Sequence, residues 1–142
     1  MKKNLIVVTG GAGFIGYNLI SLLIEKTHYR IISIDNYSSG SLKNHIKNNK
    51  IKYIKSETKN ISKILNEYKK NIHSLFHFGE FARIYQSFLK MNDCIESNTV
   101  GTNAVFNFCL QNKIKLIYSA TSASIGNKGE DKNLSPYAFT KA

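Results

Sequence analysis

The sequence of 142 residues predicts an α/β fold built on a doubly wound parallel sheet. Short apolar runs alternate with helical patterns along the chain, the order that right-handed strand–helix–strand crossovers produce. The first run, Leu5–Val8, is apolar throughout, as expected for a strand buried on both faces of a parallel sheet. A glycine-rich stretch, TGGAGFIG at 9–16, separates this run from the first helical pattern.

The later elements follow the same alternation. The predicted strands are 5–8, 30–35, 51–54, 74–78 and 115–118. The predicted helices are 14–26, a short polar one at about 41–49, 61–68, a long region over 84–112 broken near 91–93, and one beginning near 135. A polar loop is expected over 119–134. No repeat or linker interrupts this order, so we predict one domain, residues 1–142.

Composition narrows the functional class. The formal net charge is +11, which can indicate a nucleic-acid or anionic-membrane partner. The lysines are dispersed, however, and Arg30 and Arg83 are the only arginines, so we expect no nucleic acid; an anionic small ligand explains the charge equally well. No apolar run approaches the ~20 residues of a membrane span. We expect no membrane partner, no metal site, and reduced thiols at Cys94 and Cys109 in a cytoplasmic protein.

The glycine-rich stretch has the spacing of a dinucleotide-binding loop. In such loops an early glycine permits a tight turn, a middle one lets a pyrophosphate approach the backbone, and the last lets helix and strand pack closely. The helix that follows supplies amide donors and the positive end of its dipole. The residues predicted to bind the cofactor here are Gly10, Gly13, Phe14, Ile15 and Gly16.

Asp35 ends the second predicted strand nineteen residues after Gly16, where a carboxylate binds the hydroxyl pair of an adenosine ribose. The same carboxylate repels a 2′-phosphate, and Asn36 and Tyr37 supply no arginine to hold one. The sequence therefore predicts NAD rather than NADP, with Asp35 and Asn36 among its contacts. A glycine-rich turn followed by a capping or loop aspartate is the alternative.

A second candidate site begins at Ser135. Serine is favoured at a helix N-cap and Pro136 at the first helical position, so Tyr137 and Lys141 lie four residues apart on one helical face. A nearby ammonium lowers the pKa of a phenol, which favours Tyr137 as general base for a sugar hydroxyl during hydride transfer. A surface pair is the alternative for this spacing taken alone.

Together these stretches resemble the N-terminal part of an extended short-chain dehydrogenase/reductase of the NAD-dependent epimerase/dehydratase type, whose members act on nucleotide sugars. The matching stretches are Thr9–Gly16, Asp35–Asn36, His77–Gly79, Asn98–Thr102, Ser119–Gly126 and Tyr137–Lys141. The resemblance implies a Rossmann fold, apparently truncated before the substrate domain, because relatives continue far beyond the last motif. Relatives often dimerise through the long central helix and the Tyr137 helix; a homodimer of this chain is left open.

The resemblance also implies roles for individual residues. Tyr137 would be the base, Lys141 its partner and a ligand of the nicotinamide ribose, and Thr121 a hydrogen-bonding partner of the reacting hydroxyl. Phe78 and Gly79 would pass beside the cofactor. Asn98 would reach the same site from the long central helix, with a helix-surface amide as the alternative.

The chain departs from the family pattern in ways that bear on the reaction. Dehydratase relatives carry Thr-Asp-Glu where this chain has Thr121, Ser122 and Ala123, so no acid–base pair stands there for elimination. We therefore expect an epimerase or related oxidoreductase transferring hydride at the carbinol of a nucleotide sugar. The alternatives are an NAD-binding fragment without turnover, a dehydratase or a reductase. Glu80 replaces a small residue, and either a substrate contact or a plain loop carboxylate explains it.

Overall fold

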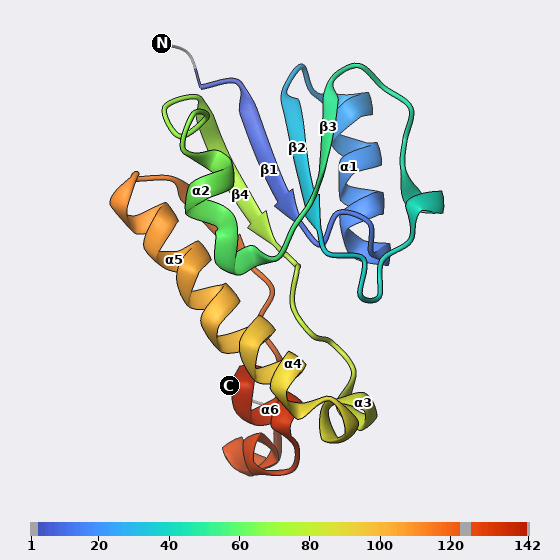
Figure 1. Ribbon diagram of the computed structural model, residues 1–142, viewed down its shortest axis with the longest axis vertical. Helices are drawn as coiled ribbons and strands as arrows, with labels where there is room; N and C mark the ends of the chain where they lie inside the picture. The colour runs from blue at the N-terminus through green and yellow to red at the C-terminus, as the bar shows by residue number, and fades with distance from the viewer. Residues whose placement is uncertain (1–2, 123–125, 142) are drawn as a thin grey trace.

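The computed structural model describes residues 3–122 and 126–141, and within these ranges a parallel sheet is covered by helices on both faces (Figure 1). The strands are β1 (Leu5–Thr9), β2 (Arg30–Asp35), β3 (Ile51–Lys55), β4 (Ile72–His77) and β5 (Lys115–Tyr118). The α-helices are α1 (Phe14–Lys26), α2 (Ile61–Leu65), α3 (Ile84–Leu89), α4 (Met91–Ile95), α5 (Thr102–Gln111) and α6 (Pro136–Lys141).

The strand order is β3-β2-β1-β4-β5, and all four pairings are parallel. The chain begins in the middle of the sheet, moves to one side as far as β3, and crosses back to place β4 on the other side of β1. The order therefore reverses between β1 and β4. Doubly wound sheets bind their ligands at this switch point, outside the carboxyl ends of the strands.

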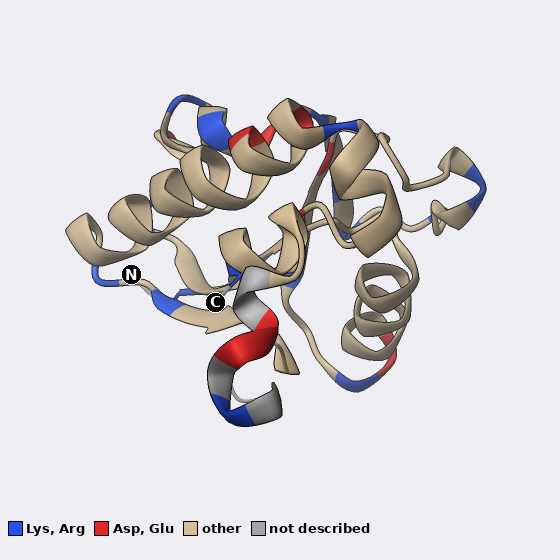
Figure 2. Ribbon diagram, turned by 90° about the horizontal axis from the view of Figure 1, so that it is seen from below, with Lys and Arg blue, Asp and Glu red and all other residues tan. Residues whose placement is uncertain are grey.

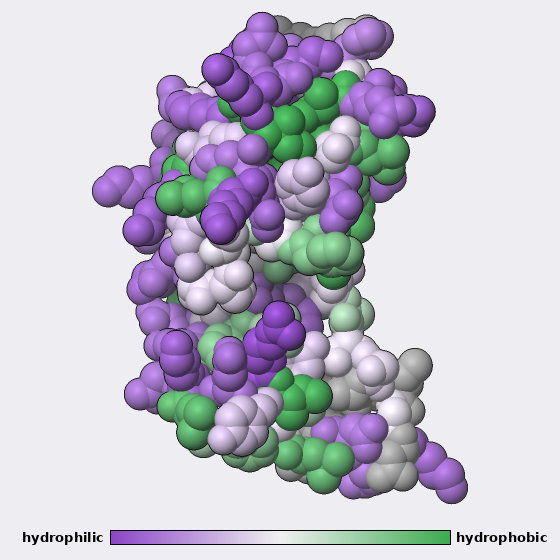
Figure 3. All heavy atoms as spheres, turned by 90° about the vertical axis from the view of Figure 1, so that its right-hand side faces the viewer, coloured by the Kyte–Doolittle hydropathy of each residue, from purple (hydrophilic) through white to green (hydrophobic). Residues whose placement is uncertain are grey.

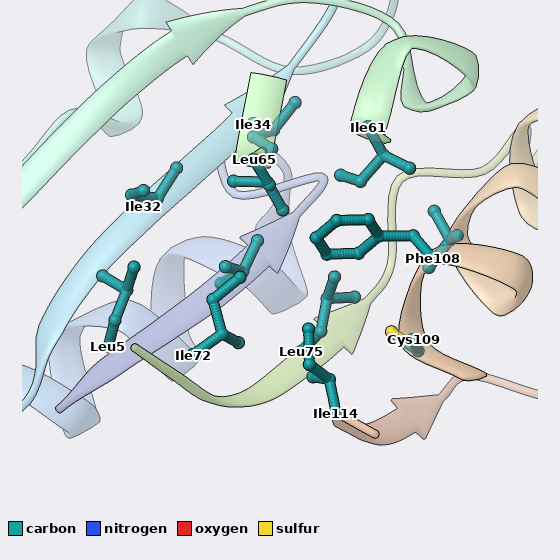
Figure 4. Close-up of a cluster of buried hydrophobic side chains, with 12 residues drawn as sticks. Leu5, Ile32, Ile34, Ile61, Leu65, Ile72, Leu75, Phe108, Cys109 and Ile114 are labelled. Atoms are coloured by element: carbon teal, nitrogen blue, oxygen red, sulfur yellow. The ribbon is translucent and has the colours of Figure 1, made fainter. Parts of the chain in front are cut away.

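Side chains of β1 alternate between two cores, one on each face of the sheet. Leu5 and Val7 join the larger cluster, in which α2 and α5 pack on the sheet through Leu65 and Phe108 (Figure 4). Ile6 and Val8 join the smaller cluster beneath α1. All five residues of β1 are buried, which confirms the prediction of a central strand covered on both faces.

Three predicted helices differ from the structure. The helix predicted over 61–68 is helical only over Ile61–Leu65. The region 41–49 contains only a 3₁₀ turn, Leu42–Asn44, because Asn44 Nδ2 donates to the carbonyl of Ala12 at 2.7 Å and ties the segment to the glycine-rich loop. The helical region 84–112 is interrupted at Lys90, whose backbone is not helical (φ −127°, ψ 53°). The interruption therefore lies just before the position predicted for it, 91–93. A π-helical turn, Glu96–Gly101, then joins α4 to α5.

The short helices α3, α4 and α6 lie beyond the carboxyl end of the sheet (Figure 1). They leave hydrophobic side chains exposed, and Figure 3 shows hydrophobic residues at this end of the molecule among others elsewhere on the same face. A groove of about 410 Å³ runs between them, lined by Phe88, Met91, Ile95 and Phe139 among others. The region 126–133, predicted as loop, forms 3₁₀ turns that lead into α6.

Charge does not gather on one face. Figure 2 shows the lysine and arginine residues distributed over several elements, which accords with their dispersion in the sequence. Both cysteines are buried and free, Cys94 in α4 and Cys109 in α5, as predicted. No helix among residues 3–122 and 126–141 has both the length and the apolar character needed to cross a membrane.

Candidate functional site at the carboxyl edge of the sheet

The glycine-rich loop joins β1 to α1 through contacts that exclude a side chain at two positions. Gly10 has a φ of +70°, and a Cβ there would lie 2.7 Å from the carbonyl carbon of Phe78. A Cβ on Gly16 would overlap the carbonyl oxygen of Gly10 and lie 2.7 Å from Gly11 Cα. The loop is therefore folded against itself and against the end of β4 through backbone alone, as the sequence predicts for a tight turn and a close helix–strand approach.

The first turn of α1 is left free to receive an anion. Gly13 occupies the N-cap without a side-chain hydrogen bond, and the first turn contains no acidic residue. The predicted contact residues Phe14 and Ile15 are exposed, at 82% and 57% of their surface. The free amides at a helix N-terminus, together with the helix dipole, favour a phosphate group. The backbone cradle and these amides fit the pyrophosphate of a dinucleotide.

Asp35 ends β2 beside this loop. Its Oδ2 accepts from the amide of Ala12 at 2.9 Å, and its Oδ1 accepts from the amide of Tyr37 at 2.8 Å. Each carboxylate oxygen has a further lone pair, so hydroxyl groups of a ribose can still donate to it. Gly40 lies against both oxygens, since a Cβ there would stand 3.0 Å from each. Asn36 follows in the turn, where its Oδ1 accepts from Ser38 N.

Phe78 and Gly79 extend from β4 next to the glycine-rich loop. The amides of both residues donate to Thr9 Oγ1, at 3.2 and 3.1 Å. Thr9 is the last residue of β1, so this contact fixes the ends of the two strands that flank the switch point. The structure thus places Gly10 and the predicted pair Phe78–Gly79 together at one edge.

A buried hydrogen-bond chain leads from Thr9 toward the second candidate site. Thr9 Oγ1 accepts hydrogen bonds from two backbone amides, so its own hydroxyl donates to His77 Nδ1, with 2.6 Å between Oγ1 and Nδ1. Burial, and secondarily the charge of Lys141, lowers the pKa of His77 to about 4, so the ring is neutral at pH 7. It therefore carries its hydrogen on Nε2 and donates to Thr102 Oγ1 at 3.0 Å. Thr102 in turn donates to Glu80 Oε1 at 2.8 Å.

Lys141 lies at the other end of this chain. Its ammonium contacts Glu80 Oε2, Tyr118 Oη at 3.1 Å and the carbonyl of Ser119 at 2.5 Å. The side chains of Lys141 and Glu80 are each only 5% exposed. Burial alone would lower the pKa of Lys141, but the contacts with Glu80 and then Tyr118 outweigh it, and the pKa is raised. Lys141 is therefore a buried, charged group at the carboxyl ends of β4 and β5.

Tyr137 is the second residue of the same helix, whose first turn is held by two serine hydroxyls. Ser135 Oγ accepts from Ala138 N at 3.0 Å, which confirms Ser135 as the N-cap. Ser87 Oγ, in α3, accepts from Tyr137 N at 3.2 Å. Thr121 follows β5 at the same edge of the sheet. Ala123, which stands at the third position of the dehydratase Thr-Asp-Glu motif, lies outside the described residues.

Asn98 is 3% exposed, so the alternative of a helix-surface amide is wrong. Its Oδ1 accepts from Phe81 N at 2.7 Å, and its Nδ2 donates to Phe81 O at 3.0 Å and Thr140 Oγ1 at 3.1 Å. Asn98 therefore ties the segment after β4 to α6 from within the π-helical turn. Its predicted contact with the cofactor stays a prediction.

Some residues of this site carry little local sequence signal. Tyr118 is an ordinary strand residue in the sequence, and Thr102 only ends a stretch that resembles the family; their contacts with Lys141 and Glu80 give them a place in the site. The sequence left two explanations for Glu80, a substrate contact or a plain loop carboxylate. Its burial against Lys141 shows that it is not a plain loop carboxylate.

The parallel sheet, the glycine cradle and the acidic residue after β2 define a dinucleotide-binding α/β protein. The family model described as "NAD dependent epimerase/dehydratase family" matches residues 6–142, and the chain belongs to this family. A curated relative, the ADP-L-glycero-D-manno-heptose-6-epimerase of Brachyspira hyodysenteriae, is 33% identical over 96% of this chain and 46% of its own length. The chain thus spans about half the length of that relative.

Solved structures agree in fold. The UDP-N-acetylglucosamine 4-epimerase of Methanobrevibacter ruminantium, in complex with UDP-N-acetylmuramic acid, is 30% identical, with a TM-score of 0.79 over 99% of this chain and 48% of its own. The UDP-glucose 4-epimerase of Thermus thermophilus in complex with NAD is 23% identical, with a TM-score of 0.79 over 97% of this chain and 47% of its own. Both likenesses support the predicted Rossmann fold, and this chain spans about half the length of each of the two solved structures.

Proposed function

We propose that this chain is the NAD-binding part of a nucleotide-sugar epimerase. The observation that carries the proposal is the placement of the glycine cradle and of buried Lys141 at one edge of the sheet, on either side of the β1–β4 switch point. The family membership and the names of the relatives support the same conclusion.

The chain's own residues would bind NAD in three places. The amides at the start of α1 would hold the pyrophosphate, with Gly10 and Gly16 leaving room for it. Asp35 would accept from the adenosine ribose, and its charge disfavours a 2′-phosphate. Phe78 and Gly79 would lie beside the nicotinamide half. When bound, NAD supplies the hydride acceptor and donor for a sugar carbinol.

The proton would move through the residues that follow β5. Tyr137 would take the proton of the reacting hydroxyl, and Thr121 would hydrogen-bond that hydroxyl. Lys141 would bind the nicotinamide ribose and place a positive charge near the phenol. An epimerase additionally needs the keto sugar to present its other face, and the sequence between 119 and 123 offers no Asp–Glu pair for water elimination instead.

A second candidate function is NAD binding without turnover by this chain. The observation that favours it is that this chain matches only 46–48% of the length of these relatives.

Calorimetric titration with NAD and with NADP tests the cofactor, and the expected result is tighter binding of NAD. Incubation with NAD and UDP-glucose, UDP-N-acetylglucosamine or the ADP-heptose, followed by NMR of the sugar, tests the reaction. Epimer formed by the chain and abolished in Tyr137→Phe supports the epimerase. NAD binding with no epimer supports the second function, and no NAD binding contradicts both.

A further inference from the structure

Glu80 is the residue of the candidate site that the family resemblance does not explain. It lies three residues after the end of β4, in a segment where the sequence pattern of relatives has a small residue. The structure nonetheless buries most of its side chain among polar partners: Lys141 at Oε2, and Thr102 and Tyr118 at Oε1. A buried carboxylate is costly unless it is paired and hydrogen-bonded, so this arrangement requires Lys141 to stay charged.

The three hydrogens of the Lys141 ammonium all have acceptors. Two of the acceptors are neutral, the hydroxyl of Tyr118 and the carbonyl of Ser119, whereas Glu80 is an anion. A charge-assisted hydrogen bond is about twice as strong as a neutral one, so a ribose hydroxyl would replace a neutral acceptor before it replaced Glu80. Glu80 is therefore the contact that persists when Lys141 turns one hydrogen to a ligand.

Glu80 is itself held in place by residues distant in sequence. Thr102 donates to it from the start of α5, and the Tyr118 hydroxyl donates to it at 3.0 Å from the end of β5. Through Thr102 and His77 the carboxylate is connected to Thr9, which fixes the ends of β1 and β4. A carboxylate fixed on three elements can hold a flexible lysine side chain in one position.

We propose that Glu80 is a positioning residue for the cofactor site: it anchors the ammonium of Lys141, in its charged state, where the nicotinamide ribose of NAD would bind. The inference rests on the proposed function for the role of Lys141. Among the described residues, the titratable groups that face this ammonium are Glu80 from the segment after β4, Tyr118 from β5, whose ring centroid lies 4.5 Å away, and His77 from β4. Tyr137 lies on α6, the helix that carries Lys141.

The test is a double-mutant cycle on NAD affinity with Glu80→Gln and Lys141→Met, each with a circular-dichroism check of folding. Glutamine keeps the shape but removes the anion, so Glu80→Gln is expected to weaken NAD binding about tenfold. In the Lys141→Met background the same change is expected to alter the affinity less than about twofold, because the anchored group is gone. The matched control is Glu96→Gln, which removes an exposed partner of Lys59 and should leave NAD affinity unchanged.

The pH dependence separates anchoring from a merely structural role. In Glu80→Gln the burial of Lys141 remains while its anion is lost, so its pKa should fall below the ordinary value. NAD affinity of the variant should then be lost as the pH rises through that lowered pKa, at a pH where the unaltered chain still binds. NMR titration of labelled lysine side chains, with Lys141→Met for assignment, measures the pKa directly.

Three results would overturn the proposal. Glu80→Gln could weaken NAD equally in the presence and absence of Lys141, could tighten NAD because the carboxylate withholds the lysine, or could leave the pKa of Lys141 unchanged. The NMR titration needs no cofactor. A chain that binds no NAD would therefore contradict the proposed function, while the lysine pKa would still decide whether Glu80 anchors Lys141.

Discussion

The two halves of the candidate site are held together in different ways. The glycine-rich end is built from the β1–α1–β2 unit and the segment that follows β4, and the backbone there leaves no room for a Cβ at Gly10 or Gly16. The Lys141 end is assembled from four separate segments, and its contacts are hydrogen bonds between buried polar side chains, centred on Glu80. The first depends on the absence of side chains, and the second on charge and hydrogen-bond complementarity.

This difference teaches where each half is sensitive. The glycine loop is disrupted by added side-chain volume, because a Cβ would overlap neighbouring backbone atoms. A change of pH has little direct effect on these backbone contacts. A buried ion pair fails when one partner is removed or when its surroundings change protonation, because the remaining charge loses its compensation. Substitutions at the two ends should separate these two modes of failure.

The largest effect is expected from Lys141→Met. The substitution leaves the buried carboxylate of Glu80 without its cation, and breaking a buried pair in this way costs about 4 kcal/mol in the free energy of unfolding. Urea denaturation measures the loss. The double variant Lys141→Met with Glu80→Gln should recover most of it; a double variant as unstable as the single would show that the two groups are not coupled.

A pH effect is expected next, from His77. Its pKa is about 4 in the folded chain and near 6.5 unfolded, so the unfolded state binds more protons between these values. Stability should therefore fall by about 3 kcal/mol as the pH is lowered from 6.5 to 4, and no further below 4 from this group. Denaturation across this range should show a shallower fall in His77→Gln. The matched control, His28→Gln at an exposed position, should keep the full pH dependence.

A smaller effect is expected at the glycine-rich end from Gly16→Ala. The added methyl group would overlap the carbonyl oxygen of Gly10, so the loop must shift, at a cost of about 2 kcal/mol and with loss of NAD binding. Gly13→Ala is the control, since its Cβ would lie 3.3 Å from the same oxygen, and at most about 1 kcal/mol is expected. Equal losses for the two variants would mean that close packing does not set the sensitivity of this loop.

The smallest effect is expected from Glu96→Gln. This carboxylate pairs with Lys59 at 2.6 Å on the exposed surface, where solvent screens the attraction. The denaturation midpoint should not change measurably. A clear loss of stability would show that ion pairs of this chain matter whether or not they are buried, and would remove the contrast with Glu80.

Local sequence signals were sufficient where the physics is local. The strand β1, the turn at Gly10, the helix start at Ser135 and the acidic end of β2 were all predicted from residue type and spacing, because backbone conformation and burial pattern act over a few residues. Predictions failed where a distant contact decided the outcome. The segment 41–49 was predicted as a short polar helix but is held by Ala12, thirty-two residues from Asn44.

Residue types and their spacing were enough to predict the fold class, the glycine cradle with Asp35, and the family to which the chain belongs. Contacts between distant segments were needed to show that Glu80 is buried, that Asn98 joins two segments rather than facing solvent, and that His77 and Thr102 connect Thr9 to the Lys141 site. The physical reason is sequence separation. The partners of Glu80 lie 22, 38 and 61 residues away, so no local spacing encodes their meeting, which depends on the sheet bringing the ends of β4 and β5 beside α6.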